Sequence, residues 1–264
     1  MKLSTHLAAA LLVVALIGLL GANLGSGDGP KRAAAIDSFA SLPGSPPPAL
    51  KIGAPERLSP GRFVSRWTTI RTAALAHIRP AAESPVIARI APETPEGTPN
   101  ALLVLRSKSD SNERLWVQVR LPVLPNGRVG WLMRHALGAY QSANTHLVVN
   151  REHLTATLYR RGKEVFSAPV GIGTDAWPTP PGEFMIRSEL TRYASPFYGP
   201  VAFGTTARSA VLTDWPGGGF VGIHGTNEPQ LIPGRVSHGC IRLRNADILR
   251  LVVLMPVGTP LTIR

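Results

Sequence analysis

Two short stretches near the C-terminus decide the fold and the chemistry of the chain: Gly-Ile-His-Gly-Thr at residues 222–226 and Ser-His-Gly-Cys-Ile-Arg-Leu at residues 237–243. Cys240 is the single cysteine among 264 residues, which excludes an intramolecular disulfide and a cysteine-rich metal knuckle. A thiol attacks a carbonyl only as the thiolate, and a neighbouring imidazole can take its proton. We therefore interpret Cys240 as a nucleophile that needs a base.

His224 is the candidate base. It follows an apolar run at residues 220–223 that predicts a strand, and the alternation of a strand would place its ring beside a glycine on one face. Gly239 permits a close bend of the backbone before Cys240, so that successive N–H groups can point at a developing oxyanion. We expect His238, which is nearer in sequence, to fix this loop rather than to serve as a second base.

Other interpretations of these residues stay open at this point. A buried, inert thiol is a common state of a lone cysteine. His224, His238 and Cys240 together offer three metal ligands, whereas a structural zinc site usually takes four. Arg242, two residues after the cysteine, is either a functional group or a solvated charge.

Residues 144–264, which surround the two stretches, are predicted to be mostly β with one clear helix. Apolar runs bounded by turn residues predict strands at 147–149, 155–159, 165–168, 183–186, 211–213, 220–223 and 261–263. An Arg-Gly-Lys turn at residues 161–163 predicts a hairpin. Asn245 is placed to cap a helix, which Pro256 would end.

A third motif, Thr-Pro-Pro-Gly-Glu-Phe at residues 179–184, completes a specific pattern. With it, residues 144–264 resemble the L,D-transpeptidase catalytic domain. The resemblance implies a β-sandwich-like fold and a thioester formed on the peptide stems of peptidoglycan, without cofactor or metal. An amine of a second stem would then resolve the thioester and form a crosslink. Covalent inactivation by carbapenems at Cys240 is implied as well.

The resemblance also implies a role for individual side chains and carbonyls. Cys240 is the nucleophile and His224 the general base. The backbone carbonyl of Gly225 orients the imidazole ring. Arg242 holds the loop or binds a carboxylate of the stem peptide.

The loop before the nucleophile is implied to form the oxyanion hole. Its donors would be the backbone N–H groups of His238, Gly239 and Cys240. Ser237 and His238 would shape the loop.

Residues 65–140 are predicted to form a small β domain. Short apolar runs predict strands at 86–90, 102–105, 116–119 and 129–132. A Pro-Asn-Gly turn joins the last two, and each of them carries a tryptophan. This stretch resembles bacterial Src-homology-3-like domains attached to wall enzymes. We therefore expect a small β-barrel that serves either in wall targeting or as a spacer.

The N-terminal residues are predicted to export the chain. Lys2 precedes an apolar run at residues 7–22, which indicates a signal peptide or a membrane anchor within residues 1–25. Residues 26–64 are rich in Pro, Gly and Ala and indicate a linker. We expect the protein in the cell wall or at the extracytoplasmic face of the membrane, with membrane contact only through an uncleaved N-terminal segment.

The formal net charge of +12 points to an anionic partner. The arginines are scattered, so we expect anionic wall polymers rather than nucleic acid. Two alternatives to a transpeptidase stay open: a carboxypeptidase or other hydrolase that uses water at the same site, and a non-catalytic wall-binding protein. Papain-like peptidases fit less well, because they place the cysteine before the histidine in the chain.

Overall fold

Strands make up most of the regular structure, so the predicted mainly β fold is confirmed. The computed structural model describes residues 54–59, 63–191, 195–212 and 218–264. The predicted signal or anchor and most of the predicted linker lie outside these residues. Within the described ranges, no helix is long and apolar enough to cross a membrane.

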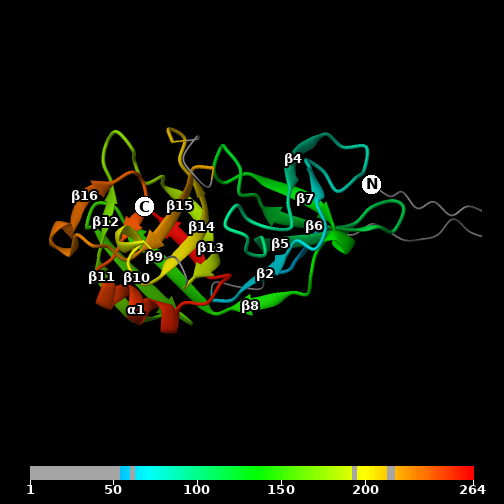
Figure 1. Cartoon of the computed structure of the whole chain (residues 1–264). Coiled ribbons are helices and arrows are strands. Elements are labelled where there is room, and N and C mark those ends of the chain that lie inside the picture. Colours follow the sequence, from blue (N-terminus) through cyan, green and yellow to red (C-terminus); the bar gives the residue numbers. More distant parts are fainter. Residues whose placement is uncertain (1–53, 60–62, 192–194, 213–217) are drawn as a thin grey trace, which may run out of the picture. The chain divides into compact units, whose positions relative to one another are not determined.

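The N-terminal sheet has the strand order β4-β3-β7-β6-β5-β2-β8, and β1 pairs with β5 (Figure 1). Its strands are β1 (Glu56–Arg57), β2 (Ser65–Thr69), β3 (Ala74–His77), β4 (Val86–Ile90), β5 (Ala101–Ser109), β6 (Leu115–Arg120), β7 (Val129–Met133) and β8 (Gln141–Ala143). The four predicted strands are confirmed. The kinship with Src-homology-3-like domains stays a prediction.

Two details of this sheet bear on the sequence predictions. The Pro-Asn-Gly turn joins β6 to β7 as predicted, and Gly127 adopts a φ of +85°, which favours glycine. The linker was predicted to extend to residue 64, but β1 pairs with β5 and Leu58 is buried. Ser59 also donates a hydrogen bond to the Val104 carbonyl. The end of the predicted linker therefore belongs to the sheet.

The C-terminal sheet has the order β11-β10-β9-β18-β13-β14-β15-β17-β12-β16 (Figure 1). Its strands are β9 (Thr145–Asn150), β10 (Thr155–Arg160), β11 (Lys163–Pro169), β12 (Gly171–Gly173), β13 (Gly182–Leu190), β14 (Ala202–Arg208), β15 (Phe220–His224), β16 (Gly234–Ser237), β17 (Ile241–Arg242) and β18 (Pro260–Ile263). The long strand β13 pairs with β18 through residues 182–185 and with β14 through residues 186–190, and so joins the two parts of the sheet.

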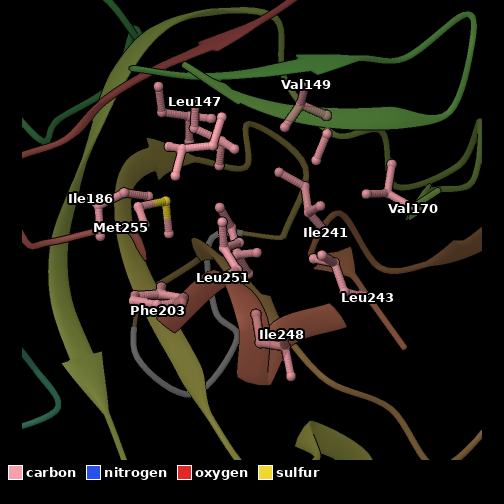
Figure 2. Packing of buried hydrophobic residues seen from close by; sticks show 14 of the residues in the cluster. Leu147, Val149, Val170, Ile186, Phe203, Ile241, Leu243, Ile248, Leu251 and Met255 are labelled. Carbon is pink, nitrogen blue, oxygen red and sulfur yellow. The ribbon is translucent and has the colours of Figure 1, made fainter. Parts of the chain in front are cut away.

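The predicted helix is confirmed as α1 (Asn245–Leu254). Its buried face carries Ile248 and Leu251, which pack in one cluster with strand residues such as Phe203 and Ile241 (Figure 2). Burying a large aliphatic side chain stabilises a fold by about 1.5–3 kcal/mol, so this face anchors the helix to the sheet.

One predicted strand is wrong. Residues 211–212 form no strand, and Thr213 lies outside the described residues. The N–H groups of Val211 and Leu212 both donate to the hydroxyl of Ser209, at 3.3 and 3.0 Å. A serine hydroxyl that takes local backbone donors competes with a strand ladder. The strand in this region is β14, which ends before Ser209 and was not predicted.

Candidate active site

Parallel pairing of β15 with β17 brings the two sequence motifs together. Ile223 lies opposite Ile241, and His224 lies opposite Arg242. Both isoleucines are fully buried, so a slip in register would move apolar side chains out of the core. Cys240 directly precedes β17, and its Sγ accepts a hydrogen bond from the Gly222 N–H at 3.4 Å. The core packing therefore places the thiol beside the strand that carries the imidazole.

Gly222 lies beside both reactive groups. A Cβ at this position would lie 3.9 Å from Sγ of Cys240 and 4.0 Å from Cδ2 of His224. As the alternation predicted, glycine and histidine share a face of β15. A side chain at residue 222 would therefore touch both the thiol and the ring.

The His224 ring is held in one tautomer. Its Nδ1 lies 2.6 Å from the carbonyl oxygen of Gly225, which can only accept a hydrogen bond. The proton is therefore assigned to Nδ1, and Nε2 is left as an acceptor. The ring of Tyr198 packs against the imidazole with centroids 4.6 Å apart. The Gly225 carbonyl thus occupies the position that the sequence motif implied.

Burial keeps both reactive groups neutral. It lowers the pKa of His224 to about 4, against a partly opposing hydrogen bond to Gly225, and the charge of Arg242 lowers this pKa further. Burial also raises the pKa of the Cys240 thiol, although the Gly222 N–H and Arg242 act in the opposite direction. The resting pair is therefore a thiol and a neutral imidazole, and proton transfer has to accompany attack.

The Ser237 hydroxyl ties together the loop before the nucleophile. It donates to the Cys240 carbonyl at 2.6 Å and accepts from the Gly239 N–H at 3.1 Å. Gly239 has a φ of +110°, a conformation that side chains disfavour. One of the three predicted oxyanion donors, the Gly239 N–H, is therefore engaged within the loop.

A second hydroxyl holds the same loop from outside. Thr179, the first residue of the Thr-Pro-Pro-Gly motif, donates to the Gly239 carbonyl at 2.8 Å and accepts from the Gly173 N–H at 2.9 Å. The ring of His238 lies 4.3 Å from that of Trp177, centroid to centroid. These contacts fit the predicted role of His238 in shaping the loop.

Two cavities are lined in part by Cys240. The first, of about 290 Å³, is lined by residues that include Phe197, Ser209, Leu212, Ser237, His238 and Arg242. The second, of about 70 Å³, is lined by residues that include Glu96, Leu190, Ala202, Phe203, Gly204 and Gly222. Both share Tyr198, Phe220, Val221, His224 and Cys240. Cys240 and His224 therefore border both cavities.

Arg242 borders the first cavity and forms an ion pair there. Its Nη1 lies 3.2 Å from Oε2 of Glu228, and the arginine side chain is 19 % exposed.

In the parts of the chain that the structure describes, no group of three or more His, Cys, Asp or Glu side chains is placed to hold a metal ion.

Three residues at the site were not predicted as site residues: Tyr198, Thr179 and Asn245. Asn245 accepts a hydrogen bond from the Thr226 N–H at 2.9 Å and so holds the segment after His224, whereas Arg244 occupies the helix N-cap position. Thr179 lies in a recognisable motif, which was a usable signal. Tyr198 and Asn245 carried no such signal, because an aromatic residue is usually core and an asparagine before a helix is usually a cap.

Comparison with known proteins identifies the family of the C-terminal part of the chain. The family model of the L,D-transpeptidase catalytic domain matches residues 144–263. YqjB of Bacillus subtilis, which bears the L,D-transpeptidase name, is 30 % identical over 124 residues, covering 43 % of this chain and 68 % of that protein. The chain belongs to the L,D-transpeptidase family. The match includes all three motifs and leaves the N-terminal sheet outside.

Two further L,D-transpeptidase comparisons have different coverage. YkuD of Bacillus licheniformis, which bears the same name, is 37 % identical over 117 residues, covering 44 % of this chain and 64 % of that protein. The catalytic domain of the Enterococcus faecium L,D-transpeptidase aligns with a TM-score of 0.35 and 24 % identity, covering 46 % of this chain and 96 % of that one. The chain spans just under two thirds of the length of YkuD.

Proposed function

We propose that the protein is a peptidoglycan L,D-transpeptidase that acylates Cys240 with one stem peptide and transfers the acyl group to an amine of a second. One observation carries the proposal. The register of β15 against β17 brings the Cys240 thiol beside the strand that carries the neutral His224 imidazole, and both side chains line the same two cavities. The family membership of residues 144–263 supports the same conclusion.

In the first half-reaction, Cys240 attacks the carbonyl of an L-centre in the stem. Nε2 of His224 takes the thiol proton as the C–S bond forms, since Nδ1 is committed to Gly225. The developing oxyanion receives hydrogen bonds from backbone N–H groups of residues 238–240. The Gly239 N–H can take part only after its hydrogen bond to the Ser237 hydroxyl breaks. The imidazolium then protonates the leaving amine, and the terminal D-amino acid departs.

In the second half-reaction, an amine attacks the thioester. His224 takes the proton of the attacking amine as the new C–N bond forms, and the C–S bond breaks. The thiolate then recovers that proton. Arg242, at the rim of the first cavity, binds a carboxylate of the donor stem in this proposal.

The remaining predictions concern location and partners. We propose that the protein acts outside the cytoplasm, on the wall, after export through its N-terminal segment. The N-terminal sheet is proposed to be Src-homology-3-like and to contact wall polymers or space the catalytic domain from its surroundings.

The test compares the wild-type protein with Cys240→Ala on isolated muropeptides, followed by mass spectrometry. Wild type should give an acyl adduct on Cys240 and crosslinked dimers, and the variant should give neither. Because the chain has one cysteine, the adduct can be assigned without mapping. Dimers formed by Cys240→Ala would contradict the proposal, and trimmed monomers without dimers in the presence of acceptor would identify a hydrolase.

A further inference from the structure

The second cavity beside Cys240 is bordered by a side chain from the N-terminal half of the chain. Glu96, in the segment between β4 and β5, lines it together with Gly222, His224 and Cys240. The described residues from 54 to 264 belong to one compact unit, so this segment and the catalytic sheet are parts of the same unit. The family model begins at residue 144, so Glu96 lies outside the residues that match it.

Glu96 is held in place by an ion pair. Nη2 of Arg187 donates to both carboxylate oxygens, at 3.0 and 2.8 Å. The Arg187 side chain is 1 % exposed, and its guanidinium carbon lies 3.7 Å from the centre of the Phe220 ring. The Glu96 side chain is 21 % exposed. A carboxylate accepts up to about four hydrogen bonds, so Glu96 can bind a further donor from the cavity.

The two cavities differ in charge. Among the described residues that line the first, Arg242 is a cation and none is acidic. Among those that line the second, Glu96 is an anion and none is a lysine or arginine. Each of these groups also has a partner outside the lining, Glu228 for Arg242 and Arg187 for Glu96, so the cavities differ in the group that each presents. The guanidinium of the first cavity favours a stem carboxylate, and the remaining acceptor sites of the carboxylate in the second favour an amine donor.

We propose that Glu96 is a specificity-determining residue that binds the cationic amine of the acceptor stem in the second cavity. The role rests on the proposed transfer reaction. The ammonium group donates to the Glu96 carboxylate and loses one proton to solvent before attack. His224 takes the next proton as the C–N bond forms and the C–S bond to Cys240 breaks.

The experiment compares Glu96→Gln with Glu93→Gln, a matched change in the same segment at an exposed position outside both cavities. Thioester formation is followed by mass with the donor stem alone, and dimer formation is followed over a range of acceptor concentrations. We expect the acceptor KM of Glu96→Gln to rise about tenfold, as loss of a charge-assisted hydrogen bond would give. The rate of thioester formation should not change, and Glu93→Gln should match wild type in both.

Two results would overturn the role of Glu96. One is an unchanged acceptor KM. The other is an equal fall in thioester formation and transfer, which would mean that the residue only supports the fold. Because the Arg187 charge is buried, Glu96→Asp serves as a second variant that keeps the charge but withdraws it from the cavity, and its acceptor KM should rise by a smaller factor. A wild-type protein that forms no thioester would instead overturn the proposed function itself.

Discussion

Asp110, directly after β5, and His224, in β15 beside the half-buried Cys240, are buried titratable groups with opposite environments. The Asp110 carboxylate accepts hydrogen bonds from Nε1 of Trp116, from the N–H and Nε of Arg114, and from another backbone N–H of its own turn, at 2.8–3.0 Å. Burial acts to raise its pKa, but these donors outweigh burial and lower the pKa to about 2.

The reactive pair has fewer compensating contacts. One hydrogen bond to His224 and one to Cys240 do not offset burial. The pKa of His224 is therefore lowered and that of Cys240 raised, and both shifts favour the neutral form. The difference separates a structural charge, which is permanent, from a catalytic pair, which becomes charged only during reaction. Substitutions and pH changes should therefore affect the two regions in different ways.

The largest expected effect is on chemistry. His224→Gln removes the proposed base, so it should lower the rate of thioester formation by about 10³-fold. Its midpoint of thermal unfolding at neutral pH should stay within about 3 °C of wild type. His146→Gln is the matched control, since His146 is a partly buried histidine of the same sheet that bonds Thr262 and lines neither cavity beside Cys240. Near-normal acylation by His224→Gln would remove it as the base.

The next effect is on stability against acid. The folded pKa of His224 is about 4, below its ordinary value of 6.5, so between these values the unfolded chain binds more protons. The free energy of unfolding should therefore decrease as pH falls through this window, by about 3 kcal/mol. Urea unfolding at about pH 7 and about pH 4 measures the change, and His224→Gln should lose correspondingly less. Equal losses in the two proteins would show that His224 is not the group responsible.

The smallest expected effect is that of Asp110→Ala, which should lower stability without affecting acylation. Asp110→Ala leaves the buried indole N–H of Trp116 and two backbone N–H groups without their acceptor, so it should lower the midpoint of thermal unfolding by several degrees. Thioester formation by the folded variant should equal that of wild type. Asp175→Ala, at a side chain that is 96 % exposed, should change neither quantity. Impaired acylation by folded Asp110→Ala would contradict a purely structural role of Asp110.

Local sequence patterns predicted much of this molecule. Runs with strand periodicity and turn residues located most of the strands, and the apolar residues after Asn245 located the helix. The motifs singled out Cys240 and His224, which the structure brings together. The prediction failed at residues 211–212, because the Ser209 hydroxyl takes backbone donors that an apolar run alone would assign to a ladder.

By itself, the sequence determined the mainly β class, the single nucleophile and the family, because these depend on residue types at short spacing. Tertiary structure decided which side chains meet at the thiol. The parallel register of β15 and β17, the place of Asn245 beside Thr226, and the arrival of Glu96 at the second cavity all depend on contacts between distant segments. Such contacts form because the whole chain buries its apolar surface in a common core. The hydrophobic effect depends on the area buried and not on which residues are adjacent in the sequence, so no local pattern predicts these contacts.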